Sequence, residues 1–389
     1  MKTYDWIVVG GGITGAALSY ELRHKGFSVL LLEQNATLQG ATPYSYGGLA
    51  YWSGTSELTR QLCQEGIERH RTLSDELETD TQFREVDLLL TIAAENDPEK
   101  VAANYTNFAI PPRLLSVEEA HELEPLLNQK AIAGALTVRH GHIHPEKITQ
   151  GYIQAFCRAG GEVQITPVVE LLRQGDRVLG VKTPEKTYQA AKTVVCAGGL
   201  SRALLKASGI DVRVYFTHAE CIDIPAGDIQ LQTLVMPAET KRFELEAKAS
   251  ASEVEPLWNE PGYEPVPLIL DAGAVQFLDR SIRIGQISRV LTDPYAEVAA
   301  QDSEAAIRSQ VGKVLPALEK LPGTWHHCRV AFSGNRLAVV GAIPGVEGAY
   351  IFSGFTNPLV FVPSIAKRFA NWASGQEDEI IAQLSSRIV

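Results

Sequence analysis

The strongest constraint on this chain is a glycine-rich turn that joins an apolar strand to a helix near its start. Residues 3–9 are short, β-branched and continuously apolar, as in a strand buried on both faces of a parallel sheet. Three glycines follow at GxGxxG spacing: Gly10, Gly12 and Gly15. Residues 14–25 favour a helix, and residues 28–32 form a second strand that ends at Glu33. This βαβ unit predicts a dinucleotide site, because free N–H groups at the helix start bind phosphates and the carboxylate accepts bonds from ribose hydroxyls.

The three glycines have separate physical roles in such a turn. The first permits the tight turn, the second lets the backbone approach the pyrophosphate, and the third lets helix and strand pack closely. This fingerprint alone does not separate FAD from NAD. Residues 40–49 (GATPYSYGGL) place small and hydroxyl side chains directly after the βαβ unit, as a flat ring system lying against backbone requires. We therefore expect FAD as the cofactor.

The charge balance argues against nucleic-acid binding. The chain of 389 residues carries 35 Lys and Arg against 46 Asp and Glu, a net charge of -11. Binding of phosphate backbones requires clustered cations, and the sequence has no basic run. The five cysteines are scattered and form no CxxC pair, so the sequence predicts neither a disulfide framework nor a zinc cage.

Nothing in the sequence predicts export or a transmembrane segment. The apolar run from Trp6 to Val9 is too short for the apolar region of a signal peptide and follows Asp5. No apolar stretch approaches the roughly 20 residues that span a bilayer. We expect a cytoplasmic protein.

The order of the expected elements predicts two lobes. The α/β pattern returns with a helix over 147–159 and strands over 162–166 and 192–197. Residues 212–290 instead contain strand-like pieces separated by Pro and Gly, one of them over 274–287, which favours an antiparallel sheet. The expected fold class is an α/β, Rossmann-like FAD-binding lobe of discontinuous segments plus an α+β substrate lobe on a mainly antiparallel sheet.

Later segments connect the chain to a known family. His144-Pro145 opens a helix, Thr166-Pro167-Val168 follows a strand, and residues 194–199 (VVCAGG) join a strand to glycines. Residues 351–363 (IFSGFTNPLVFVP) combine a strand, a loop and a helix start. With the N-terminal fingerprint, these segments resemble the D-amino-acid-oxidase-like FAD-dependent oxidoreductases, most closely glycine oxidase and monomeric sarcosine oxidase.

The resemblance implies domain boundaries and a set of FAD-binding residues. The implied FAD-binding domain comprises residues 1–82, 145–213 and 324–389, and the substrate-binding domain residues 83–144 and 214–323. The flavin ring would lie between them. Motif and resemblance together assign the following residues to FAD: Gly10, Gly12, Ile13, Thr14, Gly15, Glu33, Gln34, Thr42, Ser45, Gly47, Gly48, Leu49, Val168, Ala197, Gly198, Asn357, Pro358 and Leu359.

The implied activity is oxidation of the C–N bond of a small amino acid or secondary amine, with a hydride passing to flavin N5 and the imine product hydrolysing. An amino-acid substrate needs a fixed cation for its carboxylate, and Arg grips it in a planar, bidentate way. Arg329 is the expected anchor, and Arg336 is the alternative because the alignment requires a one-residue shift. Glycine oxidase has an Arg before Asn357, where this chain has Thr356. Thr356 therefore joins the candidate substrate site and puts the substrate's identity in question.

Other functions stay open at this point. The same superfamily includes FAD-dependent dehydrogenases of 2-hydroxy acids or polyol phosphates, whose acidic substrates Arg329 would serve equally well. A third hypothesis is a non-catalytic, accessory protein that retains the fold. Oxygen or another electron acceptor would complete the reaction, and the sequence does not distinguish them.

Two further features are ambiguous. Some sarcosine-oxidase-type members attach FAD through a cysteine in the region of Cys328, so the resemblance makes Cys328 a candidate for a covalent bond, with neighbouring cations lowering its pKa. His140, His142 and His144 alternate as metal ligands on a strand would. However, Gly141 and the following proline favour a turn, and we expect no metal site.

Overall fold

Parallel strands form the core of the first sheet. The computed structural model describes residues 2–239, 241–334 and 337–388. The strand order is β16-β17-β10-β1-β2-β7, and all neighbours are parallel except β16 and β17. Its strands are β1 (Thr3–Val9), β2 (Val29–Glu33), β7 (Glu162–Ile165), β10 (Thr187–Val195), β16 (Val339–Ala342) and β17 (Ala349–Ser353). A hairpin of β8 (Glu170–Gln174) and β9 (Arg177–Lys182) extends β10 in antiparallel sense. The continuous apolar pattern of β1 and β2 reflects burial on both sheet faces.

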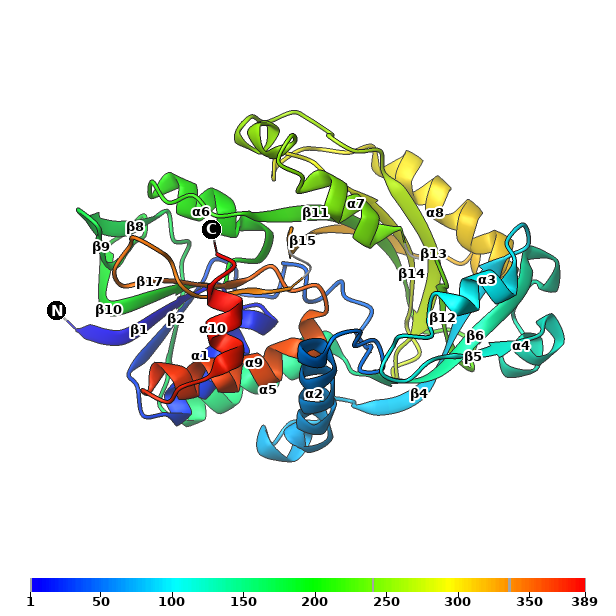
Figure 1. The fold of residues 1–389 in the computed structure, drawn as a ribbon, viewed down its shortest axis with the longest axis horizontal. Helices are drawn as coiled ribbons and strands as arrows, with labels where there is room; N and C mark the ends of the chain where they lie inside the picture. The colour runs from blue at the N-terminus through cyan, green and yellow to red at the C-terminus, as the bar shows by residue number, and fades with distance from the viewer. Residues whose placement is uncertain (1, 240, 335–336, 389) are drawn as a thin grey trace.

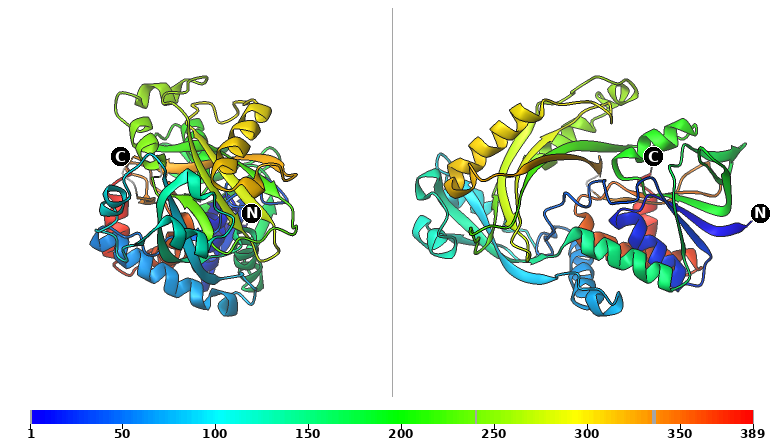
Figure 2. Two further views of the ribbon diagram at one scale, coloured as in Figure 1. Left: turned by 90° about the vertical axis from the view of Figure 1, so that its right-hand side faces the viewer. Right: turned by 180° about the vertical axis from the view of Figure 1, so that it is seen from behind.

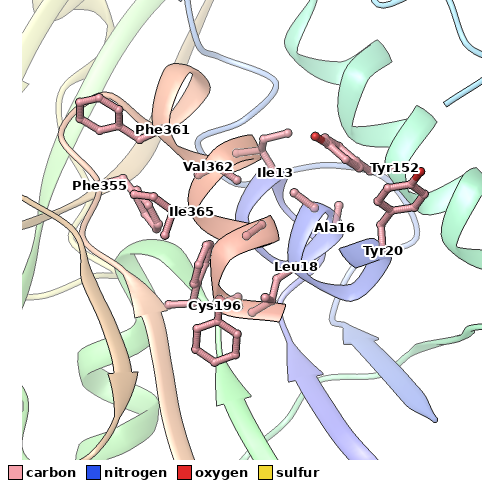
Figure 3. Close-up of a cluster of buried hydrophobic side chains, with 14 of the residues drawn as sticks. Ile13, Ala16, Leu18, Tyr20, Tyr152, Cys196, Phe355, Phe361, Val362 and Ile365 are labelled. Carbon is pink, nitrogen blue, oxygen red and sulfur yellow. The ribbon is translucent and has the colours of Figure 1, made fainter. Parts of the chain in front are cut away.

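Helices cover this first sheet on one side with a large apolar core. They are α1 (Ile13–His24), α2 (Glu57–Glu76), α5 (Pro145–Arg158), α9 (Pro358–Ala373) and α10 (Glu379–Ser385). Figure 3 shows part of this core, in which Ile13 and Leu18 of α1 meet Val362 and Ile365 of α9, and Tyr152 of α5 lies beside Tyr20. On the other side, α6 (Ser201–Ala207) packs beside a second apolar cluster. Residues 3–33 therefore dock against the last helices of the chain, far away in sequence.

The second sheet is strongly curved and mainly antiparallel (Figures 1 and 2). Its order is β15-β11-β14-β13-β12-β4-β6-β3, with β5 paired to β6, and only β12 and β4 run parallel. The strands are β3 (Gly48–Leu49), β4 (Arg84–Ala93), β5 (Arg113–Leu115), β6 (Ile132–His142), β11 (Val214–Ile224), β12 (Leu234–Pro237), β13 (Ile269–Gln276), β14 (Ile282–Arg289) and β15 (Thr324–Ser333). The short helices α3 (Pro98–Ala103), α4 (Val117–Leu123) and α7 (Arg242–Ala249) lie beside it.

Helix α8 (Ala300–Val314) defines the outer face of the curved sheet. Its Ile307 and Val311 pack against Ile222 of β11 and Ile284 of β14. Because side chains alternate along a strand, the residues between these isoleucines point to the opposite, inner face. The inner face turns toward the first sheet, so it is the face on which a site between the lobes can form.

Two local expectations were wrong. The stretch 274–287 is not one strand but parts of β13 and β14, joined by a tight turn in which Phe277 N donates to Ser281 O at 2.9 Å. Arg280 in this turn has φ of 69°, which no strand allows. His140 and His142 are not in a turn either, because β6 continues to His142. Gly141 was expected to mark a turn, but it lies within β6, where the absence of a side chain lets it pack closely against Leu49 of β3.

The expected two-lobe fold class is confirmed, and one boundary within it needs revision. Strand β15 pairs along its whole length with β11 in the curved sheet, from Val214 opposite Ser333 to Asp223 opposite Thr324. Residues 324–333, which the sequence assigned to the FAD lobe, therefore belong to the curved sheet, and we propose a boundary after β15. Within the described residues, no helix has the length and apolar character that a membrane crossing requires.

Candidate functional site

A large cavity lies between the parallel sheet and the inner face of the curved sheet. Its volume is about 1730 Å³. Segments from both lobes line it, including the turn after β1, the end of β2, residues 37–46 and the start of α9 on one side. Strands β4, β6, β12 and β13 line the other side. Clefts between lobes are the usual place for ligand sites.

The glycine turn after β1 is shaped by backbone contacts. Gly10 has φ of 107°, in the left-handed range that favours glycine. A Cβ on Gly15 would lie 1.8 Å from the carbonyl oxygen of Gly10, so this position packs the helix against the strand. Gly12 lines the cavity, and a Cβ there would lie 3.2 Å from Thr42 Oγ1. The hydroxyl of Thr42 also accepts from Ile13 N at 3.1 Å, which ties residues 37–46 to the helix start.

The carboxylate of Glu33 is held in place by two backbone N–H groups. Its Oε2 accepts from Gly11 N at 2.6 Å and its Oε1 accepts from Asn35 N at 2.9 Å. Each carboxylate oxygen retains a free lone pair, and Glu33 and Gln34 both line the cavity. The phosphate-facing backbone and this carboxylate together fit the donors and acceptors of a dinucleotide such as FAD.

Most of the expected FAD residues come together at this cavity. Those that line it are Gly10, Gly12, Ile13, Thr14, Glu33, Gln34, Thr42, Ser45, Gly48, Val168, Ala197, Gly198, Asn357, Pro358 and Leu359. Gly15, Gly47 and Leu49 do not line it. Gly47 has φ of 74° and a Cβ there would meet Ile143 O at 2.2 Å, while Leu49 is fully buried in the apolar core. Gly15, Gly47 and Leu49 therefore help to shape the cavity without lining it.

The start of α9 is a third element that faces the cavity. Asn357 is the N-cap and Pro358 the first helical residue, where a missing N–H costs nothing. Thr356 and Asn357 line the cavity at this helix start. The positive end of the α9 dipole therefore points toward the cavity, where it would stabilise an electron-rich edge of the flavin ring.

A buried histidine lies in the opposite wall. Trp52 Nε1 donates to His140 Nδ1 at 3.0 Å, and burial lowers the pKa of His140 to about 3. A tryptophan N–H can only donate, so neutral His140 carries its hydrogen on Nε2. A Cβ on Gly48 would lie 2.7 Å from that nitrogen, which explains the glycine.

An aromatic cluster continues this wall. Trp52, Tyr105 and Phe108 line the cavity, with ring centroids 5.5 Å apart for Trp52 and Phe108 and 5.0 Å apart for Tyr105 and Phe108. The cluster gives the substrate side a large apolar surface that the sequence analysis did not identify.

Arg329 does not have the expected surroundings of a carboxylate anchor. It lies opposite His218 in the pairing of β11 and β15, on the face where Ile222 packs under α8. Its guanidinium donates to the carbonyl of Pro294 and lies 5.5 Å from the ring centroid of Tyr295. Arg329 thus contributes to the cavity margin from the outer face of the sheet. The alternative anchor, Arg336, lies outside the described residues.

Cys328 lies on the inner face, opposite Ala219, and lines the cavity. Burial raises the pKa of its thiol to about 12, although Arg283, Arg242 and Arg329 act in the opposite direction. The neighbouring cations, Arg329 among them, lower this pKa as expected, but burial outweighs their effect. A thiolate is the reactive species in cysteine chemistry, so these surroundings argue against covalent attachment of FAD.

Arg242 is a cavity residue that the sequence analysis missed. It begins α7, lines the cavity, and lies close enough to Asp271 and Cys328 for their charges to interact. No motif marks it, because α7 is a short, polar helix after an unremarkable strand. Only the fold brings it to the inner face.

Two of the three alternating histidines are hydrogen-bonded within the protein, and the ring of the third, His144, lies 5.4 Å from that of Phe277. His142 Nε2 lies 3.0 Å from Tyr46 O, and His140 is bound to Trp52. Within the part of the chain that the structure describes, no group of three His, Cys, Asp or Glu side chains is arranged to hold a metal ion.

Comparison with known proteins extends these findings. The family model described as DAO, FAD dependent oxidoreductase, matches residues 5–372. The 4-methylaminobutanoate oxidase (formaldehyde-forming) of Paenarthrobacter nicotinovorans is 25% identical over 387 residues, which cover 94% of this chain and 43% of that protein. The chain thus spans less than half the length of that relative. Glycine oxidase of Bacillus licheniformis is 25% identical over 274 residues, covering 67% of this chain and 72% of that protein.

A solved structure shares the fold. The crystal structure of glycine oxidase from Geobacillus kaustophilus superposes with a TM-score of 0.80 at 20% sequence identity, covering 99% of this chain and 98% of that one. At this identity, the likeness establishes the architecture and not the substrate.

Proposed function

Because the chain belongs to the DAO family of FAD-dependent oxidoreductases, we propose that it oxidises the C–N bond of an amino acid or secondary amine to an imine, which then hydrolyses. Membership of this family makes the chain an FAD-dependent oxidoreductase, and its relatives include a 4-methylaminobutanoate oxidase and a glycine oxidase.

The observation that carries the proposal is the pairing of two walls across one cavity. One wall offers the glycine turn, Glu33 and the start of α9, which would hold FAD. The other offers an apolar surface with a single buried histidine, His140, that stays neutral at physiological pH. When bound, FAD supplies the acceptor for a hydride from the carbon next to nitrogen.

The protein's own residues would bind and orient the amine. An apolar wall disfavours the charged ammonium form and favours the neutral amine, whose lone pair assists hydride loss. His140 presents its Nε2–H beside Gly48 and offers one fixed donor in a largely apolar part of the wall. No strong side-chain base is needed for a neutral amine.

The test is anaerobic reduction of the purified, FAD-loaded protein. Bleaching of the flavin absorbance near 450 nm is expected with an amino acid or secondary amine and not with 2-hydroxy acids or polyol phosphates. Bleaching by a hydroxy acid alone would replace the proposal with the hydroxy-acid alternative. Peroxide detection in air, compared with an artificial acceptor, then distinguishes oxygen from another electron acceptor.

A further inference from the structure

The cavity has two cationic side chains among its described lining residues, and their surroundings differ. Arg329 lies on the outer face of the sheet, where it donates to the carbonyl of Pro294 and lies over the ring of Tyr295. Tyr295 is a surface residue that is 73% exposed. Arg242 lies on the inner face, and its side chain is 24% exposed. Only the second is positioned over the apolar wall.

The guanidinium of Arg242 is only partly engaged. Its Nε donates to Glu246 Oε1 at 2.7 Å. Its Nη2 is buried, and none of the described residues supplies that nitrogen with an acceptor. Its Nη1 has no hydrogen bond to the described residues either and is not among the buried nitrogens, so this end of the guanidinium is the one that a ligand in the cavity can reach. Arginine is also the side chain best suited to a planar carboxylate.

The aromatic cluster lies at the same end of the cavity as Arg242. The hydroxyl of Tyr105 donates to the carbonyl of Ala238, in the turn that leads from β12 into α7. Phe108 stacks on Tyr105, and both line the cavity. A ligand whose carboxylate meets Arg242 therefore has an apolar surface within reach for the rest of its body.

We propose that Arg242 binds the substrate's carboxylate and that the cluster of Trp52, Tyr105 and Phe108 receives an apolar group on the same molecule. The inference rests on the proposed function and narrows it: the substrate is an amino acid with a large apolar side chain or N-substituent, rather than glycine. Arg242 acts as a binding residue and takes no part in bond breaking.

The test uses benzoate, an unreactive aromatic carboxylate, titrated into the FAD-loaded protein and followed by the change in flavin absorbance. Arg242→Met should weaken benzoate binding by about 30-fold or more, because it removes a buried charged contact. Arg242→Lys should give an intermediate loss, since a point charge lacks the planar grip. Arg329→Met, the matched control, should change the dissociation constant by less than roughly three-fold. Loss of binding in the Arg329 variant instead would overturn the assignment.

Controls separate a binding role from a structural one. Arg242→Met leaves the carboxylate of Glu246 buried without its partner, so the double variant Arg242→Met/Glu246→Gln restores neutrality. The double variant should keep its flavin content and melting temperature and still fail to bind benzoate. Glu246→Gln alone should bind benzoate at least as well as the wild type. Equal loss in Glu246→Gln would mean that α7 packing, and not the guanidinium, controls the site.

A comparison of benzoate with acetate tests the role proposed for the aromatic cluster. Benzoate should bind about ten-fold more tightly than acetate, and Phe108→Ala should reduce that ratio. An unchanged ratio would remove the aromatic cluster from the proposal. Because benzoate binding needs no turnover, it fails or succeeds independently of amine oxidation. Flavin reduction by glycine in preference to phenylalanine would contradict the proposed substrate class while leaving C–N oxidation intact.

Discussion

The two walls of the cavity are built from different parts of the polypeptide. The nucleotide wall uses backbone groups and one carboxylate at the carboxyl ends of parallel strands, together with a helix start. The substrate wall uses side chains from the inner face of a curved sheet, contributed by several strands. A substitution cannot replace a backbone group without altering the fold, whereas it can replace a side chain on the inner face. The first wall therefore fixes the reaction class, and the second is free to determine the substrate.

The largest effect should come from the glycine turn, where the two roles of glycine can be separated. Gly15→Val should prevent stable folding, at a cost of about 3 kcal/mol or more, because even a Cβ would lie 1.8 Å from Gly10 O. Gly12→Ala should fold, since φ is -66° and the nearest atom is a hydroxyl at 3.2 Å, but should lose flavin. Thermal melts and flavin-to-protein ratios measure the two effects. Full flavin occupancy in Gly12→Ala would place the phosphates elsewhere.

A smaller effect is expected at Glu33, where the nucleotide wall depends on one side chain. Glu33→Gln keeps the size but replaces a charged acceptor, so FAD affinity should fall by about 10- to 100-fold. Titration of apoprotein with FAD measures the change, and Asn35→Ala serves as the control because its backbone N–H, not its side chain, binds Glu33. Equal affinity in Glu33→Gln would show that the carboxylate only braces the turn.

The substrate wall should instead respond to pH through Asp271. Burial raises its pKa to about 6, and the backbone N–H of Lys241 and the charge of Arg242 act in the opposite direction. Below that pH, Asp271 becomes neutral and no longer offsets the charge of Arg242. Benzoate should therefore bind several-fold more tightly at about pH 5 than at about pH 7.5. Asp271→Asn should remove this difference, and a difference that persists would assign the titration to another group.

The same group predicts a stability effect with a defined sign. The folded-state pKa of Asp271, about 6, lies above the ordinary aspartate value of 3.8, so the folded protein binds this proton more tightly than the unfolded chain does. Its stabilising contribution is complete below that unfolded value and is lost as pH rises through about 6. Urea unfolding of Asp271→Asn should accordingly show its greatest advantage over the wild type at neutral pH.

The smallest effect is expected at Cys328. With a protonated, buried thiol, Cys328→Ser should leave flavin content unchanged, and acid should release FAD from both proteins. Denaturing electrophoresis under ultraviolet light is the measurement. A fluorescent wild-type band that disappears in the serine variant would show a covalent bond despite the raised pKa.

The nucleotide wall was predictable because its parts are local in sequence. Gly10 to Glu33 form one βαβ unit whose spacing alone dictates which groups meet, and the structure places them as expected around the cavity. The same holds for the start of α9, where Asn357-Pro358 is a recognisable helix start.

The substrate wall was not predictable in this way. Alternation along a strand places Cys328 and Arg329 on opposite faces, but it does not determine which face meets the cavity. That choice depends on the pairing of β15 with β11 and on the packing of α8, neither of which the sequence of β15 contains. Arg242 was missed for the same reason: its place follows from the fold of a segment without a motif.

The long pairing of β11 with β15 has a mechanical consequence. Gly199, which lines the cavity from the first lobe, lies against Cβ of Arg329 and of Phe216, two residues within this ladder. The ladder of ten residue pairs lies wholly within the curved sheet and meets the first lobe at this contact (Figure 2). Opening the lobes like a clamshell would leave the ladder intact but would separate Gly199 from it. We therefore expect the ease with which the lobes part to depend on the contacts at Gly199 and not on strand pairing.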